Sequence, residues 1–203
     1  GRDAHANVTR ISAYRKTHYS FRVLFAVHVR IMARTSPSLT QAHQDQWNEI
    51  VATPAFEGLP YKVETNRQGQ IVLSPHTNKH SDLQAALFQL LLEHAPEGHV
   101  SVEYALATPG GVKVPDVVWM SPSRRKAMQD TGDPSTKAPE ICVEVMSTSN
   151  TDAEMREKRA LYQEIGAKEV WVAALDGTLR FFADTEQSRS VLIPTVPQTV
   201  EKP

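Results

Sequence analysis

The sequence predicts a fold of the α/β class, of the mixed α+β type, in which a mixed β-sheet is flanked by helices and preceded by an N-terminal β-hairpin. Three observations predict it. A strand–helix–strand unit over 139–174 favours one right-handed parallel crossover. The turn sequence Pro109-Gly110-Gly111 between two apolar runs indicates antiparallel pairing. Residues 78–95 repeat apolar residues at helical spacing, which is typical of a helix packed on a sheet.

The first expected elements are a helix and a hairpin. Ser38 can cap a mostly polar helix over roughly 39–51. The segments "YKVETN" and "QIVLSP", separated by residues 67–69, have the pattern of two hairpin strands. The helix over 78–95 follows, and its apolar face consists of Leu83, Ala86, Leu87, Leu90 and Leu91.

Two further strands, at 99–107 and 112–120, flank the Pro-Gly-Gly turn. The polar stretch 121–138 comes next, and it is long for a loop without structure of its own. It contains the basic run Arg124-Arg125-Lys126. We expect a solvated surface for this run, with contact to phosphate as the functional alternative.

The last part of the chain contains the strand–helix–strand unit and a second hairpin. A strand over about 139–147 contains "ICVEVM", and a helix over 152–165 begins with the capping-box spacing of Thr151 and Glu154. The segments "EVWVAAL" and "TLRFFAD" are expected to form strands joined by an Asp176-Gly177 turn. We expect residues 195–203 to form a loose tail.

Composition limits the class of protein and its setting. The 203 residues include a single cysteine, Cys142, which excludes an internal disulfide and favours a reducing compartment. Because Cys142 lies within an apolar strand, we interpret it as a buried structural residue. No apolar run approaches the roughly 20 residues that a membrane helix needs. We therefore expect a cytoplasmic protein without membrane contact.

Charge is unevenly distributed along the chain. Residues 1–31 carry six Lys or Arg against one Asp, a net charge of +5, although the whole chain has −1, so residues 32–203 carry −6. Three interpretations of 1–31 stand: a stretch upstream of a true start at Met32, a basic tail that touches nucleic acid, or a targeting segment. We expect 1–31 to be a basic N-terminal extension that need not belong to the native protein, and 32–194 to be a single domain.

Acidic residues lie within two apolar strands, where an unpaired charge is costly. Asp116 shares a face with Val114 and Val118, and Glu144 shares a face with Cys142 and Met146. Glu103 would share the face of Asp116 if the hairpin loop has two residues, and the opposite face if it has three. Carboxylates gathered on one apolar surface favour a bound cation, and all-oxygen ligation suits Mg²⁺ or Mn²⁺.

Lys158 lies on the apolar stripe of the helix over 152–165, with Met155, Tyr162 and Ile165. It comes six residues after Asp152, roughly 9 Å along the helix axis. Glu144 lies three residues before Ser147, roughly 10 Å back along the strand. We therefore expect Lys158 and Glu144 to lie at the same level, either in a catalytic site or as a buried structural ion pair.

These residues resemble a known pattern. "VPDVVWM" followed by "PEICVEVMSTSNTDAEMREKRALYQEIGAKEVWVAAL" resembles the Uma-type family of restriction-endonuclease-like proteins, which belongs to the PD-(D/E)XK nuclease superfamily and is common in bacteria. The resemblance covers most of 55–183 and implies a restriction endonuclease-like core, so we expect 32–194 to be a single restriction endonuclease-like domain. It implies that Asp116 and Glu144 are the acidic pair of the site. Met146 stands where the superfamily has its lysine, and Lys158 matches the lysine that this family carries on the next helix.

The resemblance also supplies roles for other residues. It implies that the backbone carbonyl of Val145 is a further metal ligand, and that Glu103 or Glu64 is the last acid of the site. His76 and His80 have i, i+4 spacing. For His80 we weigh a role at the mouth of the site against helix capping or an ordinary surface position, and a zinc pair is disfavoured because no third ligand is evident.

The expected function is metal-dependent hydrolysis of nucleic acid. We expect a Mg²⁺- or Mn²⁺-dependent endonuclease that acts on phosphodiester bonds, with DNA as the expected partner and a homodimer as a possible assembly, in which Asp116, Glu144 and Lys158 are catalytic. The alternative is a catalytically inactive nucleic-acid-binding or protein-interaction module on the same fold. The charge of −6 on 32–203 favours the alternative, because proteins that grip nucleic acid usually present a basic surface. A different metal-dependent hydrolase on this scaffold is a third hypothesis.

Overall fold

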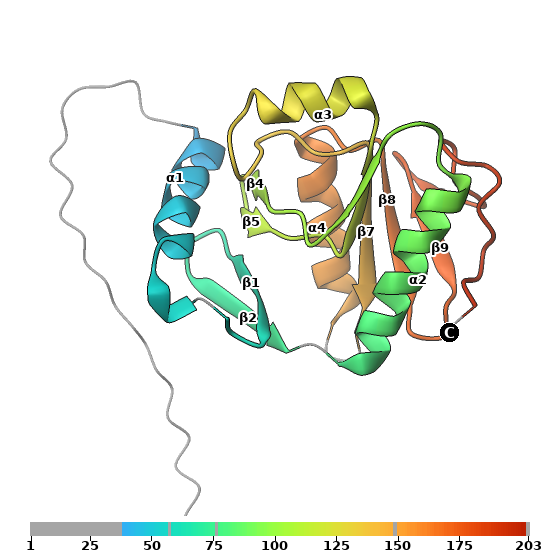
Figure 1. Ribbon diagram of the computed structural model, residues 1–203, viewed down its shortest axis with the longest axis horizontal. Coiled ribbons are helices and arrows are strands. Elements are labelled where there is room, and N and C mark those ends of the chain that lie inside the picture. Colours follow the sequence, from blue (N-terminus) through green and yellow to red (C-terminus); the bar gives the residue numbers. More distant parts are fainter. Residues whose placement is uncertain (1–37, 57, 76, 148–149, 202–203) are drawn as a thin grey trace, which may run out of the picture. The chain divides into compact units, whose positions relative to one another are not determined.

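The structure is a computed structural model that describes residues 38–56, 58–75, 77–147 and 150–201 (Figure 1). The expectations for the extension 1–31, for a start at Met32 and for His76 lie outside the described residues. Within the described ranges the helices are α1 (Leu39–Val51), the 3-10 helix η1 (Pro54–Phe56), α2 (Asn78–His94), α3 (Pro122–Gln129) and α4 (Asp152–Glu164). None of these helices is long and apolar enough to cross a membrane.

The main sheet has six strands in the order β10-β9-β8-β7-β6-β3 across the described residues. Its strands are β3 (His99–Val102), β6 (Val117–Met120), β7 (Ile141–Met146), β8 (Glu169–Ala174), β9 (Leu179–Phe182) and β10 (Glu186–Gln187). Strands β7 and β8 are parallel, and the other neighbours are antiparallel. The predicted mixed sheet and its single parallel crossover through α4 are therefore confirmed.

Alternation along the central strands divides the core into two layers. One layer joins α2 to the β6–β9 side chains that point toward it, including Val117, Val143 and Trp171. The opposite layer joins α4 and α3 to side chains such as Val118, Cys142 and Val170. Figure 1 shows α2 and α4 on opposite sides of the sheet. Glu144 shares its face with Cys142, so its side chain points toward α4.

The predicted hairpin over 99–120 is divided into two parts. β4 (Leu106–Thr108) and β5 (Gly111–Lys113) form a separate two-stranded sheet, while β3 and β6 pair in the main sheet. The two parts keep one register, because Thr108 pairs with Gly111 and Val102 pairs with Val117. This is the register of a two-residue Pro109-Gly110 loop. The prediction of two continuous strands, over 99–107 and 112–120, is wrong. The chain leaves the extended conformation between the two paired parts, where Glu103 has a φ of 48°.

The polar stretch 121–138 contains a helix, α3, that the sequence did not reveal. Ser121 caps it by accepting a hydrogen bond from the Arg124 backbone N–H at 3.2 Å. The Arg124 guanidinium donates to the carbonyl oxygens of Ala138 and Gly166 at 2.8 and 3.0 Å. Arg124 thus holds the chain around α3 in place, whereas its neighbours Arg125 and Lys126 are exposed.

Residues 195–201 are not a loose tail, so that part of the prediction is wrong. Val196 and Val200 are 5% and 6% exposed and belong to the core layer beneath α2. The preceding segment is fixed by the buried Glu169 carboxylate, which accepts hydrogen bonds from the Ser190 hydroxyl and from two backbone N–H groups. A Cβ on Gly177, whose φ is +95°, would lie 2.4 Å from the Val200 carbonyl oxygen, so this approach requires glycine.

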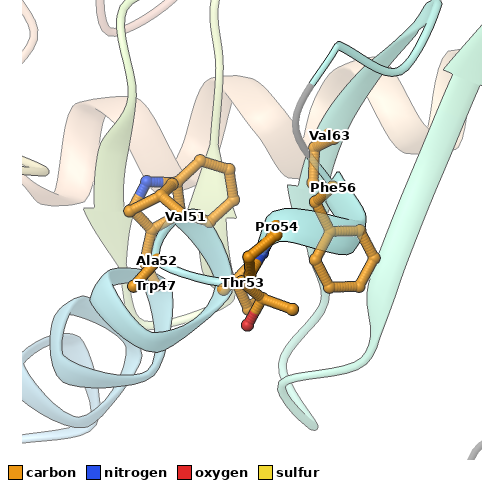
Figure 2. A pocket seen from close by; sticks show the side chains of 8 residues that line it. Trp47, Val51, Ala52, Thr53, Pro54, Phe56 and Val63 are labelled. Carbon is orange, nitrogen blue, oxygen red and sulfur yellow. The ribbon is translucent and has the colours of Figure 1, made fainter.

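The expected N-terminal hairpin is confirmed as β1 (Tyr61–Thr65) paired antiparallel with β2 (Ile71–Pro75). A pocket of about 430 Å³ lies where α1, η1 and β1 meet, and its lining includes Trp47, Ile50 and Phe56 (Figure 2). Val63 is the β1 residue that lines it. Because side chains alternate along a strand, Lys62 and Glu64 point to the opposite face.

The burial of the C-terminal segment predicts that Val200→Ala lowers the free energy of unfolding by about 1–2 kcal/mol, since it removes buried methyl groups and leaves a cavity. The exposed neighbour Thr199 provides the control, and Thr199→Ala should change stability by less than about 0.5 kcal/mol. Urea denaturation followed by circular dichroism measures both. Equal stability of Val200→Ala and wild type would show that the segment does not contribute to the core.

Candidate active site

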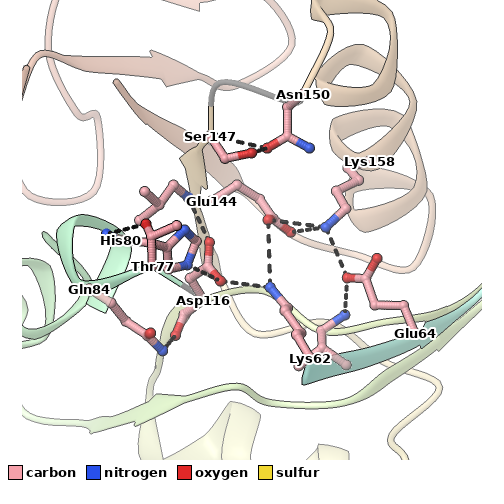
Figure 3. A network of polar contacts seen from close by, with 12 residues as sticks. Lys62, Glu64, Thr77, His80, Gln84, Asp116, Glu144, Ser147, Asn150 and Lys158 are labelled. Atoms are coloured by element: carbon pink, nitrogen blue, oxygen red, sulfur yellow. Dashed lines mark hydrogen bonds and ion pairs between the residues drawn. The ribbon is translucent and has the colours of Figure 1, made fainter. Parts of the chain in front are cut away.

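A cluster of buried charged side chains forms where β1, α2, β6, β7 and α4 meet (Figure 3). Two of its members come from β1, whose alternation places Lys62 and Glu64 on one face. They are only 9% and 7% exposed. The other charged members are Asp116, immediately before β6, Glu144 in β7 and Lys158 in α4, with His80 of α2 beside them.

Asp116 is fully buried and every oxygen atom of its carboxylate has a partner. Its Oδ1 accepts a hydrogen bond from Lys62 Nζ at 2.6 Å and lies 3.1 Å from His80 Nε2. Its Oδ2 accepts from the backbone N–H of Val145 at 2.7 Å. The Gln84 side-chain amide donates to the Asp116 backbone carbonyl at 2.9 Å. Asp116 thus joins β1, α2 and β7.

Glu144 lies at the level of Lys158, as the spacing along strand and helix predicts. Lys158 Nζ lies 3.2 and 3.1 Å from the two Glu144 carboxylate oxygens. The Tyr162 hydroxyl, one turn further along α4, donates to Glu144 Oε1 at 2.5 Å. Lys62 Nζ is 4.0 Å from Glu144 Oε2. The ammonium of Lys62 therefore lies between the carboxylates of Asp116 and Glu144.

Glu64 completes the cluster from the side of the hairpin. Its Oε1 accepts hydrogen bonds from Lys158 Nζ and from the backbone N–H of Val114, both at 2.9 Å. Lys158 thus bridges the carboxylates of Glu64 and Glu144. The cluster holds three carboxylates and two ammonium groups, so the two lysines alone do not balance the three negative charges.

Burial and neighbouring charges act in opposite directions on these carboxyl groups. Burial raises the pKa of Glu144 above its usual value, although Lys158 and Lys62 partly oppose this. For Asp116, burial acts to raise the pKa, but Lys62 and the His80 hydrogen bond outweigh it and hold the pKa well below its usual value. Glu64 behaves in the same way, because Lys158 and Lys62 overcome burial and lower its pKa.

Both lysines stay protonated in this environment. Burial acts to lower the pKa of Lys158, but Glu144 and Glu64 outweigh it and raise that pKa far above the usual value. The pKa of Lys62 is also raised, because Glu144 and Asp116 overcome its burial. Both side chains are therefore fixed cations, and neither can act as a general base near neutral pH.

The structure gathers Asp116, Glu144, Lys158, Glu64 and His80, all of which the sequence analysis selected. Glu103 is exposed whereas Asp116 is fully buried, so the two side chains do not share a buried face as expected. The backbone N–H of Glu103 donates to the Asp116 carbonyl at 3.1 Å, so the two residues are still opposite each other as predicted. Only the predicted direction of the Glu103 side chain is wrong. The structure thus favours Glu64 over Glu103 as the third acid. A carbonyl ligand from Val145 stays a prediction.

Sequence reasoning missed Lys62, Tyr162 and Gln84. A signal existed for Lys62, because it precedes Glu64 by two residues and must share its face in a β-strand. Tyr162 lies on the stripe with Lys158 and within the segment that carries the family resemblance, but neither observation assigns its hydroxyl to Glu144. No local signal marks Gln84, since its contact with Asp116 depends on how α2 packs against β6.

The cluster resembles a metal site in having several carboxylates, but here lysine ammonium groups provide the positive charge. In the part of the chain that the structure describes, no group of three or more His, Cys, Asp or Glu side chains is arranged to hold a metal ion. The carboxylates instead surround ammonium groups. The cluster as it stands is a closed ion-pair network in which Lys62 provides the cation between Asp116 and Glu144.

The hydrogen bond from Tyr162 predicts a pH-dependent stability effect. Tyr162→Phe should lower the free energy of unfolding by about 1–3 kcal/mol at pH 8, because the buried Glu144 carboxylate loses a donor. The raised pKa of Glu144 sets the direction with pH. As the pH falls through that pKa the carboxyl becomes neutral, needs fewer donors, and the cost of the substitution shrinks.

Urea denaturation in EDTA at pH 5 and pH 8 measures this difference. Tyr104→Phe, which removes a hydroxyl from a half-buried tyrosine outside the cluster, is the control. A cost for Tyr162→Phe that is larger at pH 5 than at pH 8 would contradict the assignment of a charged Glu144 as its acceptor.

Comparisons with known proteins identify the fold and the family of the chain. None of the curated proteins compared matches the chain. A crystal structure from Anabaena variabilis, described as "a putative nuclease belonging to DUF820", has a similar fold, with a TM-score of 0.53, 15% identity, and coverage of 69% of this chain and 80% of the other. The family model of Uma2, described as "Putative restriction endonuclease", matches residues 47–200. The chain therefore has a restriction endonuclease-like fold and belongs to the Uma2 family.

Proposed function

We propose that this protein is a metal-dependent endonuclease that hydrolyses phosphodiester bonds of DNA. One observation carries the proposal. The buried carboxylates of Asp116 and Glu144 come from neighbouring strands and converge on one cation, the Lys62 ammonium, at 2.6 and 4.0 Å. The structure therefore contains a position between two carboxylates that accepts a positive charge.

The donors at this position fit Mg²⁺ or Mn²⁺. Both are carboxylate oxygens, which these hard cations prefer. Asp116 and Glu144 would hold the ion, and the Val145 carbonyl is the candidate for a further ligand. A divalent cation bound here would polarise the scissile phosphate and lower the pKa of an attacking water. Since Lys62 Nζ lies at this position, its ammonium has to leave when the metal binds.

Lys158 would stabilise the charge that develops on the phosphoryl oxygens. Its Nζ is held by Glu64 and by both carboxylate oxygens of Glu144, which fixes its position; a phosphoryl oxygen would share or replace one of these three acceptors. The raised pKa of Lys158 keeps it cationic through the reaction. A preorganised cation of this kind is effective because it is not reoriented when the charge appears. His80, beside Asp116 Oδ1, would orient that carboxylate.

A second function has its own support. The Lys62 ammonium already neutralises Asp116 and Glu144, and residues 32–203 carry a net charge of −6. Both observations favour a module that binds nucleic acid or protein without catalysis. Metal binding discriminates the two functions, because the inactive module would keep Lys62 in place and take up no divalent cation.

Cleavage assays test the catalytic proposal. Asp116→Asn and Lys158→Met should each reduce Mg²⁺- or Mn²⁺-dependent cleavage of plasmid DNA by at least about 100-fold, because each removes a group that acts on the reacting phosphate. Asp130→Asn and Lys126→Met remove the same charges from exposed positions of the α3 region and should leave the rate unchanged. Thermal melting checks that each variant is folded. Cleavage that survives either substitution in the cluster would exclude the assignment.

Metal titrations test the exchange of Lys62 for a divalent cation. Lys62→Met should bind Mn²⁺ about 10- to 100-fold more tightly than wild type in calorimetry, because no ammonium competes for the two carboxylates. Lys113→Met is the matched control, since Lys113 binds the Thr65 backbone at 2.9 Å and does not lie between Asp116 and Glu144. Unchanged affinity in Lys62→Met would exclude the exchange. Absence of Mn²⁺ binding in every variant would favour the inactive module.

A further inference from the structure

Three arginines surround a small pocket beside the carboxylate cluster. Arg156 and Arg159 come from α4 and Arg180 from β9, and the pocket has a volume of about 100 Å³. Water occupies about 30 Å³ per molecule in the liquid, so this space admits a group the size of a few waters. The function proposed above gives none of the three arginines a role.

The Arg159 guanidinium is incompletely satisfied. Its carbon Cζ lies 3.6 Å from the centre of the Phe182 ring, and the Cζ of Arg180 lies 5.1 Å from the same ring. The Nε of Arg159 is buried and has no hydrogen-bond partner among the described residues. An unpaired buried donor is costly, and an acceptor in the pocket would remove that cost.

Electrostatics also favours an anion in this pocket. Burial lowers the pKa of Arg159, and the neighbouring charges of Arg180 and Arg156 lower it further. Two carboxylates partly offset these charges: Asp152 lines the pocket, and Glu186 pairs with Arg180 at 2.8 Å. One positive charge is left over, which suits a singly charged ligand such as a phosphodiester.

The register of the sheet places this pocket close to the carboxylate cluster. Glu144 of β7 pairs with Val172 of β8, and Val172 pairs with Arg180 of β9. Paired residues point to the same face, so Glu144 and Arg180 lie in one row, two strand spacings or roughly 10 Å apart. On α4, Arg159 directly follows Lys158. The two places are therefore close enough for a single strand of nucleic acid to contact both.

We propose that Arg156, Arg159 and Arg180 form a binding site for a backbone phosphate of the nucleic acid, next to the phosphate that is held at the carboxylate cluster. The inference rests on the proposed function. Arg180 forms an ion pair with Glu186 in the free protein, so the phosphate replaces the Glu186 carboxylate as the partner of Arg180 when the nucleic acid binds. The site supplies position and affinity but no sequence readout, because guanidinium contacts to phosphate are the same for every base.

Binding measured without metal tests the site separately from catalysis. The affinity of wild type and variants for a short fluorescein-labelled DNA duplex is measured by anisotropy in EDTA at several salt concentrations. Arg156→Gln and Arg180→Gln should each weaken binding by about 10-fold at low salt and reduce the slope of log K against log salt by about 1. Glu186→Gln should strengthen binding, because it releases the Arg180 guanidinium.

Arg125→Gln is the matched control, since it removes one exposed guanidinium from α3. Its affinity should stay close to that of wild type. If Arg125→Gln weakens binding as much as Arg156→Gln, the protein uses diffuse charge and the site is excluded. If wild type binds DNA and none of the pocket variants differs from it, the site is excluded while the proposed function stands. If wild type does not bind nucleic acid at all, the proposed function and the site fail together.

Discussion

The rest of the structure depends on a buried ion-pair network in which two lysines hold three carboxylates. Asp116, Glu144 and Glu64 are all less than 10% exposed, and each is paired with Lys62 or Lys158. Removing charges from water is costly, and their attraction offsets this cost only when every group is well placed. The network therefore fixes the positions of the β1–β2 hairpin, α2, β7 and α4 relative to one another, since each contributes a partner that the others need.

The need to place a positive charge beside each buried carboxylate connects stability with chemistry. The same two carboxylates that would bind a divalent cation are stabilised in the free protein by the Lys62 ammonium. In the exchange that we propose, a metal ion would bring its own positive charge and take over that neutralisation, so the carboxylates would have a cation beside them before and after binding. Lys158 differs from Lys62 because it bridges Glu64 and Glu144 from the side of α4 and can keep its place. The two lysines thus have different roles, although both appear as buried cations.

Positive charge near the cluster is local and has specific structural origins. The body of the chain is acidic, and the conspicuous basic run at 124–126 serves partly to hold α3, through the bonds of Arg124 to Ala138 and Gly166. The arginines around the small pocket come instead from α4 and β9. Net charge along the chain is therefore a poor guide to the local charge of this pocket, where three guanidinium groups exceed the two nearby carboxylates although the body of the chain is acidic.

Elements with a strong local pattern could be predicted from the sequence: the leucine face of α2, the capping box of α4, the parallel unit β7–α4–β8, and the pairing of Lys158 with Glu144, because rise per residue in helices and strands is fixed. The other features depend on contacts between residues that are distant in the sequence. Glu103 keeps the predicted register opposite Asp116 but is exposed, since the chain leaves the extended conformation there. Val196 and Val200 are buried because Glu169 holds the preceding segment against the sheet. Lys62 lies between Asp116 and Glu144 because tertiary packing brings β1 to these two residues, and no local pattern specifies that long-range contact.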